Sequence, residues 1–211
     1  MKRKPLKKTT AKAAPAKKSP ARATARTAPA RIGAATTKKP AKAIDPAAFQ
    51  AAWQKSMTTN EAHRRLEPLV GTFNARTTFC MSADAPPQTS DGISENRWVL
   101  GGRFVEQNYR GSMMNMPFEG IGFTGYDNTQ KKYVGIWMDT FGTGIATSIG
   151  KGTPSDKVIE SLFTCHEPLT GEITLRAVAR IQDRDHHTFE MWRKGPDGKE
   201  YKNMVCEYSR K

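Results

Sequence analysis

From residue 69 to the C-terminus, turn segments divide the sequence into short runs rich in β-branched and aromatic residues. Such runs predict strands, and no helical period interrupts them. The runs predict ten strands, at residues 71–81, 91–99, 103–110, 117–126, 132–139, 143–150, 157–166, 172–182, 187–194 and 200–209. Because the connections are short, we expect neighbouring strands to pair antiparallel in up-and-down order.

The predicted strands favour a barrel over an open sheet. Between Ile173 and Gln182, apolar residues alternate with mostly polar ones, as in a strand with one packed face and one wetter face. No helical layer is available to cover a ten-strand meander, so we expect it to close and thereby remove its edges. Ten strands also enclose a cavity, because barrel diameter grows with strand number. The predicted fold is all-β, a ten-stranded antiparallel up-and-down barrel.

A helix is predicted just before the barrel. Asp45 followed by Pro46 is the pattern of an N-cap with proline at the first helical position. Phe49, Trp53 and Met57 then fall on one helical face. We expect this apolar stripe to pack against another part of the protein.

A second short helix is predicted from the spacing of Thr58 and Glu61, which fits a capping box. The chain therefore divides into a tail at 1–44, short helices at 45–66 and a barrel at 67–211. This division predicts one folded domain behind a basic tail.

The tail carries the whole net charge of the protein. Residues 1–43 hold ten Lys, four Arg and no Asp or Glu, whereas residues 44–211 hold twenty basic and twenty acidic residues. Few large apolar side chains are present in the tail to offset the entropy of ordering it, so we predict disorder. The basic tail favours binding to nucleic acid or another polyanion through phosphate contacts that do not read bases. The candidate residues are Lys2, Arg3, Lys4, Lys7, Lys8, Lys12, Lys17, Lys18, Arg22, Arg26, Arg31, Lys38, Lys39 and Lys42.

The cysteines and the N-terminal residues indicate where in the cell the protein is expected to be. Cys80, Cys165 and Cys206 form no C-x-x-C pair and lie in predicted strands, which favours reduced thiols in a cytoplasmic protein. No apolar run follows the basic start, so neither a signal peptide nor a membrane span is predicted. We expect a cytoplasmic location, with nucleoid association through the tail.

The stretch GIGFTG, residues 120–125, spells the glycine pattern of a dinucleotide-binding loop. That loop requires a following helix, and the next residues predict a hairpin instead. Gly120 and Gly122 then share one face of a predicted strand. Glycine at such positions marks a barrel corner, a close backbone approach or room for a ligand, and these alternatives stay open.

No catalytic or metal-binding arrangement is predicted. The groups with acid–base chemistry lie mostly at predicted turns, where Asp is common for structural reasons: Asp127, Asp139, Asp183, Asp185, Glu190 and His187. Asp183, Asp185, His186 and His187 are of ligand type, but residues of one turn rarely converge on one ion. We therefore predict a protein that is not an enzyme and has no metal site.

Three segments, NRWVLGGRFVEQNYRG, MPFEGIGFTGYDNTQKKYVGIWMDTFGTGI and HTFEMWRKGPDGKE, resemble the bacterial domain-of-unknown-function family 1579 over residues 62–211. The stretch HRRLEPLVGTF resembles the start of calycin barrels, with Phe73 at the tryptophan of their G-x-W signature. The resemblance implies a lipocalin-like barrel and no agreed activity. The tail segment KKSPARATAR resembles the tails of linker histones.

The calycin resemblance also suggests ligands. The fatty-acid clamp of that group is not carried over, because Cys206 stands where its Arg would be, beside a retained Tyr208. Haem-binding calycins use a His near the barrel mouth, which makes His187 and His63 the candidates if haem is bound. No cofactor is otherwise predicted.

Two functions remain as hypotheses. The first is non-catalytic binding of a small apolar or amphipathic ligand in the barrel. The alternative for its residues is that they fill a packed core: Trp98, Tyr109, Phe123, Trp137, Met138, Met191 and Tyr208. The second function is nucleic-acid association through the tail, with the barrel as a structural module.

Overall fold

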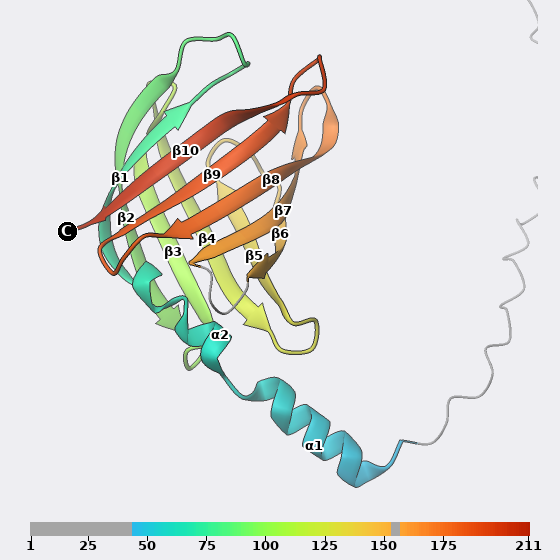
Figure 1. Cartoon of the computed structure of the whole chain (residues 1–211). Coiled ribbons are helices and arrows are strands. Elements are labelled where there is room, and N and C mark those ends of the chain that lie inside the picture. Colours follow the sequence, from blue (N-terminus) through green and yellow to red (C-terminus); the bar gives the residue numbers. More distant parts are fainter. Residues whose placement is uncertain (1–43, 153–156) are drawn as a thin grey trace, which may run out of the picture. The chain divides into compact units, whose positions relative to one another are not determined.

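The computed structural model describes residues 44–152 and 157–211 (Figure 1). Three short helices come first: α1 (Pro46–Met57), α2 (Glu61–Arg64) and the 3-10 helix η1 (Glu67–Leu69). The strands follow as β1 (Gly71–Phe79), β2 (Gln88–Val99), β3 (Phe104–Met113), β4 (Met116–Asp127), β5 (Lys132–Asp139), β6 (Ala146–Gly152), β7 (Val158–Glu167), β8 (Gly171–Ile181), β9 (His186–Lys194) and β10 (Glu200–Arg210). The predicted disorder of residues 1–43 lies outside the described residues.

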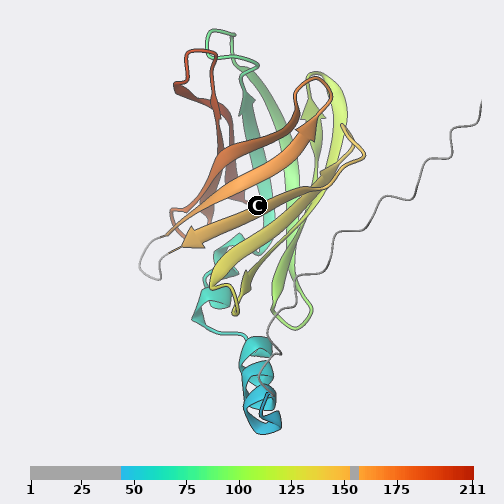
Figure 2. The same ribbon diagram turned by 90° about the vertical axis from the view of Figure 1, so that its right-hand side faces the viewer.

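The ten strands form a closed antiparallel barrel, as predicted (Figures 1 and 2). Each strand pairs with its neighbours in sequence, and β1 pairs with β10 to close the ring. Strand β2 begins at Gln88, earlier than predicted, because residues 88–90 pair with the end of β1. Strand β6 begins at Ala146, later than predicted, because its pairing with β5 starts only there.

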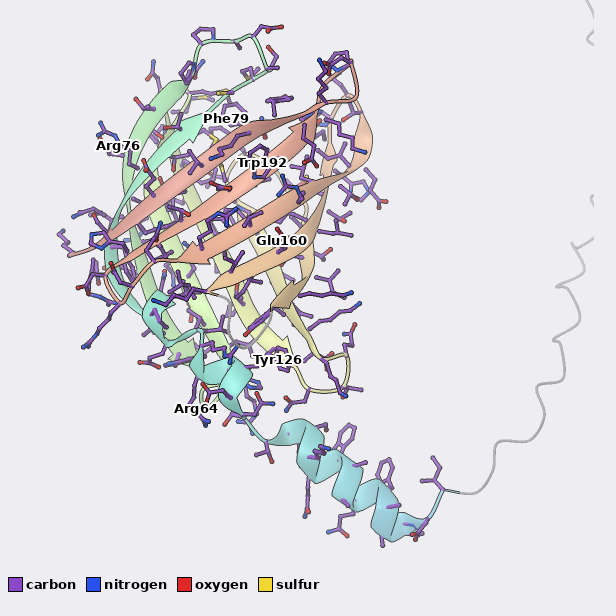
Figure 3. The ribbon with its side chains drawn as sticks, viewed as in Figure 1. Arg64, Arg76, Phe79, Tyr126, Glu160 and Trp192 are labelled. Atoms are coloured by element: carbon purple, nitrogen blue, oxygen red, sulfur yellow. The ribbon has the colours of Figure 1, made fainter. Side chains whose placement is uncertain are left out.

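The strand register decides which side chains point into the barrel. On β1, Phe73, Ala75 and Thr77 are buried, whereas Asn74 and Arg76 between them are exposed. Side chains at paired positions of neighbouring strands share a face, so the strand register extends this inward face around the whole ring. We call the end of the barrel near α2 and η1 the helix end, and the opposite end the far end. Figure 3 shows Tyr126 at the helix end and Phe79 at the far end.

The helix end is filled by side chains from α2, η1 and the strands. Leu66 is fully buried and packs with Val105 and Tyr133. The hydroxyl of Tyr133 donates a hydrogen bond to the carbonyl of Ala62, at 3.2 Å. This packing fills the helix end of the barrel.

The N-cap of α2 differs from the prediction. Asn60, not Thr58, caps this helix, and its side chain accepts a hydrogen bond from the amide of Ala62 at 2.9 Å. His63 completes the capping box, since the amide of Asn60 donates to its Nδ1 at 3.1 Å. The sequence pattern was misleading because the side chain that accepts the backbone amide of the N-cap residue is His63 and not an acidic residue.

Helix α1 has the predicted bounds and N-cap, but its apolar stripe does not pack as expected. Asp45 accepts a hydrogen bond from the amide of Ala47, and Pro46 follows at the first helical position. None of the residues of α1 is buried. The rings of Phe49 and Trp53 stack on each other 6.0 Å apart and remain exposed. The expectation that this stripe packs within the chain was wrong.

The outer face of β8 to β10 is covered by charged side chains. Arg176 pairs with Glu200 at 2.9 Å, and Lys202 pairs with Glu190 at 2.8 Å. The Trp192 ring, labelled in Figure 3, lies under both the Arg176 guanidinium and the Lys202 ammonium. This side of the barrel is therefore hydrophilic.

The three cysteines are free thiols in this structure. Of the helices in the described residues, none combines the length and the apolar character needed to cross a membrane.

Candidate ligand-binding site

The middle of the barrel is a packed core. Its buried members come from β1, β3, β4 and β10: Phe73, Ala75, Tyr109, Phe118, Cys206 and Tyr208. Met113, Trp137 and Phe189 pack against this cluster and are only partly buried. The middle of the barrel is therefore filled by the side chains of the protein itself.

A pocket of about 440 Å³ opens at the far end, beside the turns that join β1 to β2 and β3 to β4. Its apolar lining consists of Phe79, Met81, Met113 and Met114. Its polar lining consists of Thr77, Gln88, Thr89, Ser90 and Asn115. A surface of this mixed composition suits a molecule with an apolar body and a few polar groups.

Thr77 connects the pocket with the core. Its hydroxyl donates to the Sγ atom of Cys206 at 3.2 Å and lies 3.4 Å from the hydroxyl of Tyr109. Burial raises the pKa of the Cys206 thiol and of the Tyr109 hydroxyl above their ordinary values. These groups therefore stay protonated near neutral pH and are available as hydrogen-bonding groups, not as charged ones.

A second polar chain crosses the interior toward the helix end. The side-chain amide of Gln107 donates to Ser94 at 2.8 Å and to the hydroxyl of Tyr208 at 3.2 Å. Ser94 donates to Asn96, which donates to the carbonyl of Leu69 at 2.7 Å. Buried polar groups are stable in an apolar interior only when they are paired in this way. The chain thus orients side chains from β2, β3 and β10.

His187 is buried beside this network. Its ring stacks on Tyr208 with centroids 4.3 Å apart and meets the ring of Phe73 edge-on at 4.7 Å. Its Nδ1 atom is buried without a hydrogen-bond partner in the described structure. Burial, with a smaller contribution from the positive charge of Arg210, lowers the pKa of His187 to about 4. The imidazole is therefore neutral at physiological pH.

Neither candidate histidine fits an axial ligand of haem. His187 is packed between two aromatic rings and does not line the pocket. His63 is buried at the helix end, where its Nδ1 atom accepts the amide of Asn60 and its ring also hydrogen-bonds the backbone of Tyr126. The residues present therefore do not fit haem at either place.

Charged groups lie on the inward face near the far end. Arg193 and Glu167 form a bidentate pair, with distances of 2.6 and 2.9 Å. The hydrogen bonds from Arg193 hold the pKa of Glu167 below its usual value. Nearby, the indole of Trp137 donates to Asp139 at 2.8 Å. Burial raises the pKa of the Cys165 thiol, so that this residue is not an activated nucleophile.

The predicted ligand-binding residues divide into two groups. By register, Trp98, Tyr109, Trp137, Met191 and Tyr208 point into the barrel. Phe123 and Met138 instead lie on the outer face, next to the exposed Ile136 and Ile121. The pocket is lined by none of these seven residues.

The pocket residues that sequence reasoning missed lie at strand ends. Phe79 shares the inward parity of Phe73 on β1, a signal that the period-two pattern contains. Met113 and Met114 lie between the strands predicted at 103–110 and 117–126, outside the segments from which interior residues were sought. Methionine-rich segments beside an opening are also typical of adaptable binding surfaces.

The four residues of the β8–β9 turn that have metal-ligand chemistry, Asp183, Asp185, His186 and His187, do not point toward one common position. Asp183 accepts from the amides of Asp185 and His186, and Asp185 pairs with Arg210 at 3.0 Å. His187 points into the barrel. Over residues 44–152 and 157–211, no three His, Cys, Asp or Glu side chains are grouped so as to hold a metal ion. The fourteen predicted polyanion-binding residues lie outside the described residues, and their role stays a prediction.

A solved structure shares this fold. The crystal structure of Rv2717c from M. tuberculosis is 15% identical, with a TM-score of 0.55, and the match covers 73% of this chain and 99% of that one. A weaker similarity, with a TM-score of 0.40, is to EF1p2_mFAP2b bound to DFHBI, 16% identical over 71% of this chain and 99% of that one. A redesigned beta barrel is 15% identical, with a TM-score of 0.38, over 73% and 98% of the two chains.

The sequence comparisons are specific for one family. No curated protein matches this chain. Residues 49–210 match the model of the family described as a protein of unknown function, DUF1579. The match begins thirteen residues before the predicted boundary at residue 62, so it includes most of α1 as well as the barrel. The chain therefore belongs to the DUF1579 family.

Proposed function

We propose that the barrel is a non-catalytic binding module for a small apolar or amphipathic molecule, which it takes at its far end. The observation that carries this proposal is the pocket of about 440 Å³. Its volume lies within the range of small-molecule sites. Phenylalanine and methionine side chains supply its apolar surface, and hydroxyl and amide groups supply hydrogen bonds.

The chemistry around the pocket supports binding rather than catalysis. None of the nine residues that line it is acidic, basic or a histidine. Glu167 and Arg193, on the same inward face, neutralise each other. Behind the pocket, burial keeps Tyr109 and Cys206 protonated. A site with this composition can orient a ligand but holds no general base beside it.

Fluorescence titration with anilinonaphthalene sulfonate, an amphipathic probe, tests the proposal. We expect Met113→Ala to weaken probe binding about fivefold, the effect of roughly 1 kcal/mol of lost apolar contact. Ser90→Phe, which fills the pocket without removing a core contact, is expected to abolish binding. Met138→Ala is the matched control, because this methionine lies on the outer face. Native mass spectrometry of the purified protein then searches for a molecule that co-purifies.

Two outcomes contradict the proposal. If Met138→Ala weakens binding as much as Met113→Ala, the probe binds the outside of the barrel. If Ser90→Phe leaves binding unchanged in a folded protein, the pocket is not the binding site. Circular dichroism establishes that each variant is folded before it is titrated.

We further propose that the tail binds a polyanion, with nucleic acid as the first candidate. The support is the charge division: residues 1–43 carry +14, and residues 44–211 sum to zero. Basic segments of this kind neutralise phosphates without reading sequence. The salt dependence of DNA binding, given in the Discussion, tests this second function independently of the pocket.

A further inference from the structure

Helix α1 presents an apolar stripe that nothing in the described structure covers. Phe49, Trp53 and Met57 are 55%, 60% and 47% exposed. They lie at i, i+4 and i+8, so their side chains form one continuous surface along the helix. Tryptophan and phenylalanine are the side chains that contribute most to protein interfaces. Because the DUF1579 match includes all three residues, the stripe is part of the family domain and not of the basic tail.

The helix is held at its C-terminal end and lies beyond the barrel (Figures 1 and 2). Asn128, in the turn between β4 and β5, donates to the carbonyls of Ser56 and Thr58 at 3.0 and 2.7 Å. Arg103 donates to the carbonyl of Met57 at 2.7 Å. To lie along its own barrel, α1 would have to reverse direction at residues 58–60 and break these bonds. In the described residues, the stripe therefore does not lie against the barrel of its own chain.

The same chain carries a second uncovered apolar surface, on the outside of β4 to β7. Figure 2 views the barrel from the side on which β5 to β7 are labelled in Figure 1. Across these strands, the register pairs Ile121 with Met138, Phe123 with Ile136, and Ile149 with Leu162. We call these six residues the outer apolar face. Leu162 is the most exposed member of this face, with 56% of its surface accessible to solvent. The outside of β8 to β10, in contrast, is covered by charged pairs.

We propose that a second copy of this chain covers both surfaces: the α1 stripe of each copy packs on the outer apolar face of the other. The helix leaves the barrel at the turn between β4 and β5, the strands that begin this face. A twofold axis beside that turn lets two such helices run past each other onto facing barrels. In such an isologous dimer, both apolar surfaces of each copy are buried, and no surface is left to bind a third copy.

The area is sufficient for a stable dimer. The exposed parts of one phenylalanine, one tryptophan and one methionine remove about 300 Å² from water, and the face beneath them a similar amount. Two symmetric contacts then bury about 1,200 Å², the lower limit of the usual size of specific interfaces. Residues 44–211 carry equal numbers of acidic and basic side chains, so the folded parts do not repel each other.

Sedimentation equilibrium of the full chain tests the proposal, at about 0.3 M salt to screen repulsion between the basic tails. We expect the unmodified protein to be a dimer. Trp53→Glu and Ile136→Glu place a charge in the helix stripe and in the face, and each is expected to raise the dimer dissociation constant at least about 100-fold. Ile93→Glu is the matched control, because Ile93 and Ile136 are both 38% exposed on outer strand surfaces. Circular dichroism confirms that all variants are folded.

Mixing the two disruptive variants separates this arrangement from others. The Trp53→Glu chain keeps an intact face and the Ile136→Glu chain an intact helix, so the mixture regains one of the two contacts and associates more tightly than either variant alone. A monomeric unmodified protein overturns the proposal. So does a mixture no tighter than its components, which indicates pairing of α1 with α1. Binding of α1 to anionic lipid vesicles by a chain that is monomeric in solution assigns the stripe to a membrane surface instead.

Discussion

Trp137 explains the two glycines of β4. Gly122 is paired with Trp137 across β4 and β5, and Gly120 lies two positions further along the same inward face. A Cβ atom added at Gly122 would lie 2.8 Å from Cε3 of the indole, and one at Gly120 would overlap its six-membered ring. The glycines therefore leave room for a side chain of the protein itself. The space at these glycines is thus filled by the Trp137 side chain, which was not among the alternatives stated from the sequence.

The first prediction follows from this contact. Gly120→Ala is expected to lower the free energy of unfolding by about 1–3 kcal/mol, because the added methyl group displaces the indole from a packed position. Gly144→Ala is the control, since nothing lies within 4 Å of the added carbon there, and we expect it to change stability by less than about 0.5 kcal/mol. Urea unfolding measures both. Equal effects at the two positions would show that the overlap with Trp137 is not the cause.

His187 makes stability depend on pH. Its pKa is about 4 in the folded protein and 6.5 ordinarily. Between these values the unfolded chain binds a proton that the folded chain does not, so the stabilisation present above pH 6.5 is lost as the pH falls toward 4. The full difference amounts to at most about 3 kcal/mol.

The second prediction isolates this histidine. His187→Phe keeps an aromatic ring against Tyr208 and Phe73 but removes the titrating group and its unpartnered nitrogen. We expect the variant to lose less stability than the unmodified protein between pH 6.5 and 4, by about 2–3 kcal/mol. Thermal unfolding across that pH range measures the difference. Parallel pH profiles for the two proteins would mean that His187 is already accessible to protons in the folded state.

At the scale of elements, two side chains from the barrel, Asn128 and Arg103, hold the junction between α1 and α2. The Asn128 amide donates to the last carbonyls of α1 and accepts from the side chain of Asn60 at 2.6 Å. No residue of α1 is buried, so these polar contacts, and not apolar packing, set its direction.

The third prediction is that Asn128→Ala loosens α1 without affecting the barrel. We expect faster amide hydrogen exchange at residues 46–60, with an unchanged midpoint of thermal unfolding, because the helix then opens as a local unit. Thr129→Ala, a neighbouring exposed change in the same turn, is the control. Exchange mapped by mass spectrometry decides the outcome. A large loss of global stability would show instead that α1 contributes to the fold of the barrel.

The strands were predictable from the sequence, and the inward face of each strand was not. Turn residues fix where a strand ends, so the ten strands and their order follow from local chemistry. The sequence shows which face of a strand points into the barrel only when one face is more polar than the other. On β5 both faces are apolar, since Ile136 and Met138 lie outside and Trp137 inside. For this reason Phe123 and Met138 were included among interior residues although they lie outside.

For the molecule as a whole, the net charge and the family domain occupy different parts of the chain. All of the net charge lies in residues 1–43, outside the matched family domain at 49–210. The proposed polyanion binding by the tail can therefore be tested separately from the barrel, by deleting residues 1–43.

The fourth prediction concerns this tail. If it makes on the order of six to ten phosphate contacts, affinity for duplex DNA should fall about 10³- to 10⁵-fold between 50 and 200 mM salt, with little sequence preference. Deletion of residues 1–43 is expected to abolish binding, because the remainder has no net charge. Fluorescence anisotropy at several salt concentrations measures both effects. Salt-insensitive binding by the shortened chain would assign DNA recognition to the barrel.

The pairing of β1 with β10 has a consequence for synthesis. The strand that closes the ring is the last to leave the ribosome, and its partner is the first strand made. Until then, both β1 and β9 have unpaired edges that other nascent chains can join. The barrel is thus completed only after all ten strands have been made, by a contact between β1 and β10, which lie far apart in the sequence and therefore pair slowly. Chains cut short before Glu200 are expected to be substrates for chaperones and proteases rather than partly active proteins.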